Sequence, residues 1–489
     1  MPRQLGMGKI EVRQLKYDLT PVAGLALVGD HFKCFEPVLK LLDKTLPVRA
    51  GVANSDILRS YLGLLVQGKS DFDAIENHRG DKFYKHALGI ELLPSSPTLR
   101  QRMDAQAGAL GAHVPQMIET LLKSHRPDYG VLPCGWLAVD IDTFAMDNGG
   151  TAKEGVGRTY AGVDGFCPLA SYIGAYGWPL ELSLRPGTQH SAKDTEDNLK
   201  RVIPMAQRLS AAGPKAPLLA RLDSGFDSAA LMACVESMNQ PGQRQTSVQV
   251  DFLIKWNPRS TDRDEMAAQL DAGQIIGTGT GTGTGTGNGT RTGPGAGAGA
   301  GAVTWTHSRA GKRVALWEQL VVVNGIQRPV RRVLRLVERT ISAAGQHLII
   351  PEIELDGWTT TLPRSVSAQQ VIDLYADHGT HEQFHAEFKT DLDLTRLPSG
   401  KFETNTLVCH LAALAMNILR LMGQRGLLGP DAPVRHSAKR RRIKTVMQEL
   451  IYRAGRLIET GRKLILGLGA SDRAAKVFGQ MHLALAGAT

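Results

Sequence analysis

Apolar side chains at helical spacing dominate the first 130 residues of the chain. In residues 55–67 the large apolar side chains form one broad face of a helix. The same spacing recurs in three further stretches, residues 32–46, 71–88 and 97–103. Residues 9–17, KIEVRQLKY, instead favour a strand. The pattern therefore predicts a mainly helical N-terminal domain over residues 1–130.

From residue 131 the pattern changes to short apolar runs of strand length. These runs are residues 136–141, 166–174, 178–185, 217–223 and 250–256. Helical spacing separates the later runs, in residues 195–209 and 228–238. Three strands, a helix, a strand, a helix and a strand is the order of a ribonuclease H-like core. We therefore expect an α/β fold in which residues 131–256 form the first part of such a core.

A different pattern interrupts this core over residues 257–365. Strand-like runs within it are residues 303–307, 314–324, 330–338 and 347–354. Residues 277–302 alternate glycine with Thr or Ala, a composition that cannot bury enough apolar surface to fold alone. A phosphate-binding loop would need a fixed turn into a helix and a Lys, which this segment lacks. We expect a β-rich insertion subdomain with a flexible Gly-rich loop.

Helical spacing returns after the insertion. Residues 367–389 favour one helix, and residues 403–422 favour a second helix that packs on the core. We therefore expect residues 366–425 to complete the core. Glycines and prolines then end the second helix. The last region, residues 426–489, is expected to be helical and basic, with a helix over residues 444–466.

The chain carries an excess of positive charge. It has 57 Lys and Arg against 47 Asp and Glu, a formal net charge of +10. This balance suits a polyanionic partner. Residues 435–442, RHSAKRRR, concentrate positive charge in a run that is either a solvated face or a phosphate-binding surface.

Hydropathy and cysteine usage indicate the compartment. No window approaches the roughly twenty apolar residues that span a bilayer, and the first residues lack the apolar core of a signal peptide. The five cysteines are scattered without a CxxC pair, so neither a zinc site nor a disulfide framework is indicated. We therefore expect a cytoplasmic protein with no membrane partner.

Carboxylates interrupt the apolar strands at two places. Asp140 and Asp142 lie two residues apart in the first strand, so both project from one face of the sheet. Two like charges there require solvent or a cation opposite them. Asp223 ends the fourth strand, and function collects at strand ends in open α/β sheets. Simpler explanations exist, since an Asp-x-Asp pair often ends a strand before a loop and Asp223 precedes a possible helix as a cap.

The helix predicted after the insertion carries a third acidic group. Glu382, His385 and Lys389 lie on one stripe of this helix. Phe384 and Phe388 lie on the neighbouring stripe, which can pack inward. A polar stripe of this kind is most often a solvated edge. Together with the two strand-end carboxylates, however, Glu382 supplies the three acidic groups that a two-metal phosphoryl-transfer site requires.

Several motifs occur together in a fixed order. They are Asp140 with Asp142, KEGVGRTYAGVDGFCPLASYIG at residues 153–174, RPGTQHS at residues 185–191, RLDSGFDS at residues 221–228, and Tyr375 with Glu382 and Lys389. On these motifs the chain resembles a bacterial insertion-sequence transposase of the DDE type, from the group numbered thirteen-eighty and akin to the branch with a Y-(2)-R-(3)-E-(6)-K signature. The resemblance extends from about residue 50 into the C-terminal helices. It departs at one position, because the Arg expected three residues after Tyr375 is His378.

The resemblance implies an enzyme that cuts DNA at the inverted-repeat ends of an insertion sequence and joins the 3′-hydroxyl ends to target DNA. Asp142, Asp223 and Glu382 would hold two Mg²⁺ ions, with Mn²⁺ as a possible substitute and Asp140 as the alternative first carboxylate. The DNA-binding side chains would be Tyr375, His378, Lys389, Arg440, Arg441 and Arg442.

The resemblance also implies partners and a location. Residues 1–130 would bind DNA, and the protein would associate with the nucleoid in the cytoplasm. Family members pair as dimers across two element ends, so a homodimer is expected in the DNA complex. An aromatic side chain of the insertion, such as Trp358 or Trp305, is a candidate for stacking on an extruded base, although a buried core Trp is the commoner case.

Two other functions are compatible with the same residues. A metal-dependent DNA nuclease with this core would cut the ends without joining them to target DNA. A DNA-binding protein derived from a transposase would bind the ends and have lost catalysis. Cut and joined products together would be specific to a transposase.

Overall fold

The computed structural model describes residues 14, 16–240, 242, 246–259, 261–279, 301–461 and 463–486. The chain forms two compact units. The terminal unit comprises Met1–Gln101 and Ile418–Thr489, and the central unit comprises Arg102–Asn417. Most of the strand predicted over residues 9–17 and most of the Gly-rich loop over residues 277–302 lie outside the described residues.

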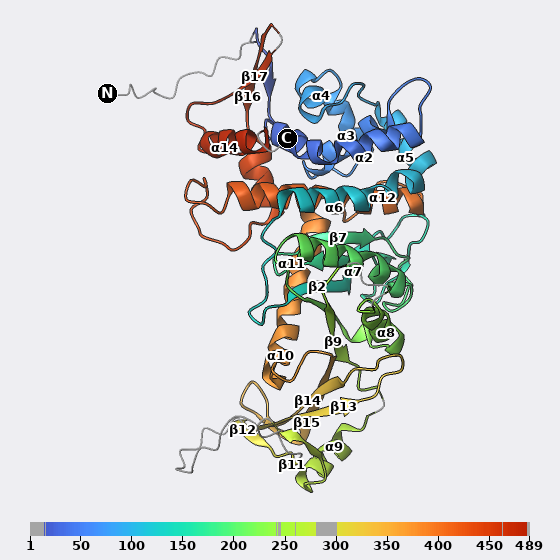
Figure 1. Cartoon of the computed structure of the whole chain (residues 1–489), viewed down its shortest axis with the longest axis vertical. Helices are drawn as coiled ribbons and strands as arrows, with labels where there is room; N and C mark the ends of the chain where they lie inside the picture. The colour runs from blue at the N-terminus through green and yellow to red at the C-terminus, as the bar shows by residue number, and fades with distance from the viewer. Residues whose placement is uncertain are drawn as a thin grey trace, which may run out of the picture. The chain divides into compact units, whose positions relative to one another are not determined.

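Five strands form the core of the large sheet in the central unit (Figure 1). They are β2 (Leu137–Thr143), β6 (Leu169–Ile173), β7 (Trp178–Ser183), β8 (Leu218–Leu222) and β9 (Val250–Trp256). Their order is β7-β6-β2-β8-β9, with β6 antiparallel to β2 and β7, and β8 parallel to β2 and β9. The helices α7 (Thr195–Ala212) and α8 (Ala229–Ser237) precede β8 and β9. The predicted order of three strands, helix, strand, helix and strand is confirmed.

Helices cover the two faces of these strands. Ser171 of β6 donates a hydrogen bond to Asn198 of α7, which places α7 on the face of Ser171 and its strand partner Ile141. The opposite face packs on α10 (Ala368–Ala376) through a hydrophobic cluster that includes Ala138, Leu219, Leu253, Val371 and Leu374. Because side chains alternate along a strand, Asp140 and Asp142 project to the face that α10 covers.

The inserted segment is β-rich, as predicted, and it continues the core sheet. Its strands are β10 (Ile276–Gly279), β11 (Gly301–Ala302), β12 (Thr306–Arg309), β13 (Lys312–Val321), β14 (Val330–Ile341) and β15 (His347–Thr360). The end of β15 pairs antiparallel with β9, so the five core strands and the six described strands of the insertion form one sheet of 11 strands. One helix, α9 (Arg263–Asp271), packs on the insertion through a separate hydrophobic cluster. The insertion is therefore an extension of the core and not an independent sheet.

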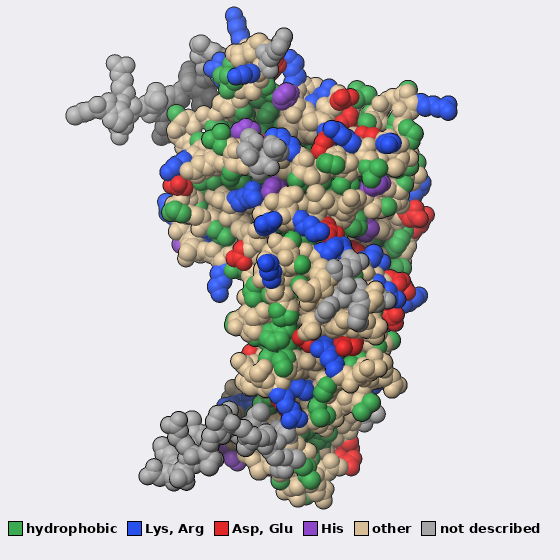
Figure 2. Space-filling model, viewed as in Figure 1, with side chains coloured by type: hydrophobic (Ala, Val, Ile, Leu, Met, Phe, Trp, Pro, Cys, Tyr) green, Lys and Arg blue, Asp and Glu red, His purple; other side chains and the backbone are tan. Residues whose placement is uncertain are grey.

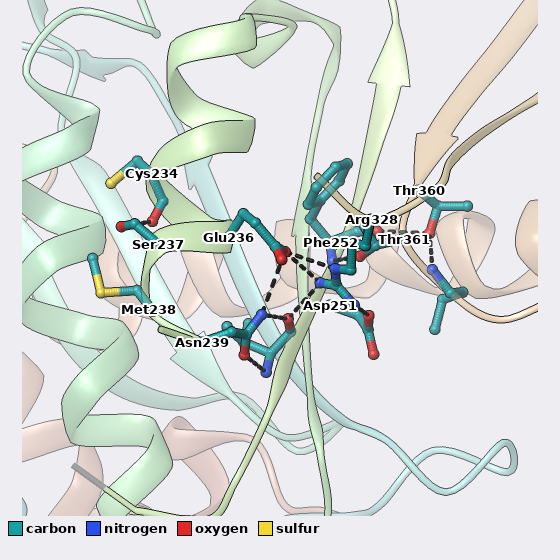
Figure 3. A network of polar contacts seen from close by, with 12 residues as sticks. Cys234, Glu236, Ser237, Met238, Asn239, Asp251, Phe252, Arg328, Thr360 and Thr361 are labelled. Carbon is teal, nitrogen blue, oxygen red and sulfur yellow. Dashed lines mark hydrogen bonds and ion pairs between the residues drawn. The ribbon is translucent and has the colours of Figure 1, made fainter. Parts of the chain in front are cut away.

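Polar contacts fix the insertion to the core (Figure 3). Arg328, in the loop before β14, donates to Glu236 of α8 and to Asp251 of β9, each at 2.7 Å. The backbone N–H of Phe252 donates to the hydroxyl of Thr361 at 3.0 Å. Both sets of contacts involve residues of β9, so they fix the insertion relative to the core strands.

The stretch predicted as one helix over residues 367–389 is a succession of helical segments. After α10 come a 3₁₀ turn (Asp377–Thr380), α11 (His381–Ala386) and a π-helical turn (Glu387–Asp391). Ser367 begins α10 with a capping box completed by Gln370. Phe384 and Phe388 are buried, which confirms the predicted inward stripe.

Helix α12 (Phe402–Gly426) confirms the helix predicted over residues 403–422 and ends where the glycines were expected to end it. Within the central unit, Asn417 of α12 donates to the carbonyl oxygen of Pro179 in β7, so this part of the helix packs on the core as predicted. By length and composition α12 could cross a bilayer, contrary to the expectation that the chain has no such segment. However, 89% of its most apolar window is buried, as in the core helix of a folded domain.

The N-terminal part of the terminal unit is helical, as predicted. Its elements are α1 (Leu25–Phe32), a 3₁₀ turn (Lys33–Phe35), α2 (Glu36–Thr45), α3 (Asn54–Leu65), a 3₁₀ segment (Phe72–His78), α4 (Lys82–Leu88) and the start of α5 (Ser96–Gly111). This part ends at Gln101, earlier than the expected boundary at residue 130. The rest of α5 and all of α6 (Val114–His125) belong to the central unit.

The C-terminal region differs from its prediction. It contains α13 (Ile443–Val446), a π-helical turn (Met447–Ile451), β16 (Gly455–Thr460), β17 (Lys463–Leu468) and α14 (Ala475–Ala486). The helix predicted over residues 444–466 is therefore wrong beyond Ile451. Gly461 has a φ of +57°, which permits the tight turn between β16 and β17. The N-terminal strand β1 (Leu19–Thr20) pairs with β16 and completes a small sheet that local periodicity could not reveal.

Candidate active site

Asp142 and Asp223 lie at the same edge of the core sheet. Asp142 is the penultimate residue of β2, and Asp223 directly follows β8, the parallel neighbour of β2. Burial raises the pKa of the Asp223 carboxyl, and the negative charge of Asp142 raises it further. The simpler role predicted for Asp223 is also present, since its Oδ1 accepts a hydrogen bond from the N–H of Gly225 at 2.8 Å. The sheet thus brings together two carboxylates that are far apart in sequence.

Asp140 has a different environment from Asp142. Arg221 of β8 donates to both of its oxygens, at 2.6 and 2.7 Å, and His378 Nδ1 lies 3.0 Å from its Oδ1. Burial alone would raise the pKa of Asp140, but the Arg221 charge and the His378 contact hold it well below its ordinary value. Arg221 also donates to the carbonyl oxygen of Leu374 in α10. A carboxylate occupied on both oxygens by a buried Arg is a poor cation ligand, so the geometry favours Asp142 as the first carboxylate.

His381 contacts Asp142 directly. Its Nε2 lies 2.5 Å from Asp142 Oδ2, and its Nδ1 hydrogen-bonds the carbonyl oxygen of His378. Burial would raise the pKa of Asp142, but the hydrogen bond and charge of His381 outweigh burial and lower it. Burial alone would lower the pKa of His381, but the hydrogen bond and charge of Asp142 outweigh burial and raise it.

His385 lies one helical turn beyond His381 and is 4% exposed. Its ring stacks on Phe144 with centroids 4.3 Å apart and lies edge-on to His381 at 4.9 Å. Burial lowers the pKa of His385 to about 3, so the ring is neutral at physiological pH. One ligand atom each from Asp142, His381 and His385 lie within 4.8 Å of one another, which is compatible with a shared cation.

Glu382 is not one of the three residues of this cluster. The side chain of Glu382 is exposed on α11, and no hydrogen bond or ion pair joins it to another described residue. Tyr375 is half-buried, and burial raises the pKa of its phenol, which the charges of Asp223 and Asp142 raise further. The Lys389 ammonium lies over the Phe144 ring, 5.8 Å from its centre.

His378 and the arginines of the terminal unit have partners within the protein. His378 is 2% exposed against Asp140, so it does not present the phosphate contact expected of the Arg it replaces. Arg441 Nε donates to the carbonyl oxygen of Leu427 at 2.8 Å. Arg440 is half-buried, and Arg442 is exposed directly before α13. Figure 2 shows Lys and Arg side chains spread over one face with Asp and Glu among them, so the net charge does not by itself locate a DNA-binding surface.

The aromatic candidates of the insertion have structural contacts. Trp358 is 2% exposed inside the core cluster, the commoner role that the sequence suggested for it. Trp305 donates to Asp271 at 2.8 Å and packs under Arg313. An aromatic residue that sequence reasoning missed is Tyr160, which is 70% exposed. Burial around its hydroxyl, and the charges that include Asp142 and Asp223, raise the pKa of Tyr160 to about 12.

His381 is the other residue that sequence reasoning missed, and His385 was assigned no role. Their signal was present in the spacing of His378, His381 and His385, which repeats at three and four residues and follows one helical face. The donor set of this cluster fits a divalent cation, because Asp142 offers a carboxylate oxygen and each His offers a ring nitrogen. Asp223 adds a carboxylate whose raised pKa shows that its charge is poorly compensated in the protein alone.

The chain matches the family described as Transposase DDE domain group 1 over residues 38–241. The matched segment contains Asp142 and Asp223 and ends before Glu382. No curated protein matches the chain. The family match supports a DDE transposase, a class of enzyme that acts on DNA and typically uses a divalent metal.

Proposed function

We propose that this protein is a DDE transposase that cuts DNA at the inverted-repeat ends of an insertion sequence and joins the 3′-hydroxyl ends to target DNA. The observation that carries the proposal is the convergence of Asp142 and Asp223 at the ends of two adjacent parallel strands. A carboxylate whose pKa is raised by burial and by a neighbouring carboxylate is suited to binding a cation. The family match over residues 38–241 supports the same class of enzyme.

The order of the strands supports a finer assignment. A central β2 flanked by antiparallel β6 and parallel β8, with helices on both faces, is the arrangement of a ribonuclease H-like catalytic core. The ordered motifs of the chain resemble those of the insertion-sequence group numbered thirteen-eighty, related to the Y-R-E-K branch, and on these motifs we further assign the chain to that group. The continuous sheet makes the insertion a fixed neighbour of the site rather than a separate module.

Three carboxylates would hold two Mg²⁺ or Mn²⁺ ions, namely Asp142, Asp223 and Glu382. When bound, the ions would activate the attacking hydroxyl and stabilise charge on the phosphoryl oxygens in an in-line displacement. Asp140 keeps its pair with Arg221 and His378 and thereby positions β2 and β8, so that Asp142 and Asp223 stay at the same edge. Tyr375 and Lys389 would contact the DNA backbone near the cut.

DNA further from the cut would contact the terminal unit. Arg442 is exposed next to the partly buried Arg440 and Arg441, and such a run neutralises phosphates without reading sequence. The helices of residues 16–101 would supply the contacts that recognise the element end. We propose that two copies of the chain pair in the DNA complex, because joining two ends to one target requires two sites.

The reaction products distinguish this function from the two alternatives. Purified protein is incubated with DNA that carries the element ends, a target plasmid, and Mg²⁺ or Mn²⁺. A transposase yields cut ends and joined products, a nuclease yields only cut ends, and a DNA-binding protein yields neither. Cut ends without any joined product would contradict strand transfer, and bound but uncut DNA would contradict the enzyme.

The assignment of the third carboxylate needs its own test. We expect Glu382→Ala to retain end binding and to lose cleavage, as we expect of Asp223→Ala. Asp377→Ala is the matched control, since Asp377 is also an exposed acidic residue on the same helical stretch. Full cleavage by Glu382→Ala would remove Glu382 from the site and leave Asp142 and Asp223 in place.

A further inference from the structure

His381 Nε2 and Asp142 Oδ2 face each other. Two hydrogen-bond acceptors cannot lie this close unless a proton or a cation lies between them. The carbonyl oxygen of His378 can only accept a hydrogen bond, so His381 Nδ1 must carry a proton. In the neutral ring Nε2 is then an acceptor, and it lies 2.5 Å from a carboxylate oxygen. Either a second proton or a metal ion must lie between these two atoms.

A His bound to a metal commonly has this second contact. Metal-ligating histidines usually donate their other ring N–H to a carbonyl or carboxylate, which fixes the tautomer and aims the ligating nitrogen. His381 meets this condition through the His378 carbonyl oxygen. Ligands bound at about 2.1 Å in tetrahedral geometry are separated by roughly 3.4 Å, so a metal would move His381 and Asp142 apart by about 1 Å.

His385 supplies an independent observation. Its side chain is 4% exposed, and its Nε2 has no hydrogen-bond partner among the residues that the structure describes. A buried polar atom without a partner costs stability, which a bound ligand would restore. Its ring lies edge-on to His381, and a ligand atom of each lies within 4.8 Å of the other and of Asp142.

We propose that Asp142, His381 and His385 form one divalent-cation site that prefers metals with affinity for imidazole, such as Co²⁺, Ni²⁺ and Zn²⁺, over Mg²⁺. This inference rests on the proposed function, because Asp142 serves both. Mg²⁺ favours carboxylate, carbonyl and water oxygens, whereas imidazole nitrogen suits the transition metals. A site with two histidines therefore selects a different metal from a site made of three carboxylates.

The test measures metal selectivity without DNA or catalysis. Full-length, metal-free protein is titrated with Co²⁺ and, separately, with Mg²⁺ by calorimetry. We expect the wild type to bind one Co²⁺ at least about tenfold more tightly than Mg²⁺. We expect His381→Ala and His385→Ala each to weaken Co²⁺ binding by at least about tenfold, with a much smaller effect on Mg²⁺. His347→Ala, which removes an exposed His of the same unit, should change neither affinity.

Two further variants keep the result decisive. If His385→Ala does not fold, as judged by circular dichroism, His385→Gln removes the imidazole and retains a polar side chain, and should give the same loss of Co²⁺ preference. Equal Co²⁺ to Mg²⁺ affinity ratios in the wild type and the folded His variants would overturn the inference. If those ratios are equal, but the wild type cuts DNA and Asp223→Asn does not, the metal-site inference fails and the proposed function stands. If Co²⁺ binds as expected and the wild type cuts no DNA, only the proposed function fails.

Discussion

Two aspartates in one strand have opposite roles because different side chains face them. Asp140 is 2% exposed, and Arg221 and His378 satisfy it. Asp142 lies two residues further along β2, where its partners are His381 and the acidic Asp223. The first therefore stabilises the fold, and the second retains the capacity to bind a cation.

Arg221→Met tests the structural role of the buried ion pair. The substitution leaves the Asp140 charge buried without its main partner, and breaking one side of such a pair costs about 3–5 kcal/mol. We expect that loss in the free energy of unfolding, measured by urea denaturation. Arg158→Ala is the control, because it breaks an exposed pair with Asp164 and should cost less than about 1 kcal/mol. A small effect of Arg221→Met would show that Asp140 needs no partner.

Asp223→Asn tests the cost of burying the Asp223 charge beside Asp142. Because the folded state raises the pKa of Asp223, ionisation of this group costs folded stability at neutral pH. The variant removes that cost and keeps an oxygen to accept from Gly225, so metal-free Asp223→Asn should be more stable than the wild type by roughly 0.5–2 kcal/mol at pH 7. The difference should vanish below about pH 3.9, where the carboxyl is protonated in both folded and unfolded states. A pH-independent difference would contradict this cause.

The helical segments after the insertion bring the histidines to β2. Phe384 of α11 packs against Gly177, in the turn between β6 and β7, where φ is +69°. A Cβ at Gly177 would lie 2.2 Å from the Phe384 ring, so only glycine lets α11 approach the sheet this closely. The position of His381 beside Asp142 therefore depends on a turn more than 200 residues earlier in the chain.

Gly177→Ala tests this dependence. The added methyl group must displace Phe384 as well as adopt a positive φ, and overpacking of this kind typically costs about 1–3 kcal/mol. Gly345→Ala is the matched control, because Gly345 has a φ of +83° and open space around its Cβ position. We expect Gly177→Ala to destabilise the protein more than Gly345→Ala and to weaken metal binding. Equal losses in the two variants would show that the contact with Phe384 carries no energy.

At the scale of the whole molecule, both ends of the chain build the terminal unit. β1 pairs with β16, and the N–H of Gly24 donates to the carbonyl oxygen of Ile451 at 3.2 Å. A Cβ at Gly24 would lie 2.1 Å from the carbonyl oxygen of Leu450, so the first helix lies directly on the C-terminal backbone. The basic C-terminal region is thus part of this unit and not a separate appendage.

Deletion of residues 452–489 tests the construction of this unit. The truncation removes β16, β17 and α14, and with them the partners of β1 and α1. We expect limited proteolysis to cleave within residues 16–101 much faster than in the full chain, with the central unit remaining resistant. Unchanged protection of residues 16–101 would contradict the shared unit.

Much of this architecture could be predicted from local sequence. The apolar runs predicted the core strands and the β-rich insertion, and the motifs predicted Asp142 and Asp223 as strand-end carboxylates. The hairpin of β16 and β17 was missed because its apolar positions also fit a helix, and its partner strand β1 lies at the other end of the chain. The different environments of Asp140 and Asp142 depend on Arg221 and His378, which only the folded chain brings into contact with Asp140.

The central claim is that Asp142 and Asp223 act together on DNA. The most direct measurement is the single-turnover rate of end cleavage in Mg²⁺ or Mn²⁺ for the wild type, Asp142→Asn, Asp223→Asn and the double variant, with end binding measured alongside. We expect each single variant to bind the ends normally and to cut at least about a thousandfold more slowly, and the double variant to be no slower than either, as for groups that act as a unit. Cleavage at the wild-type rate in either single variant would contradict the account.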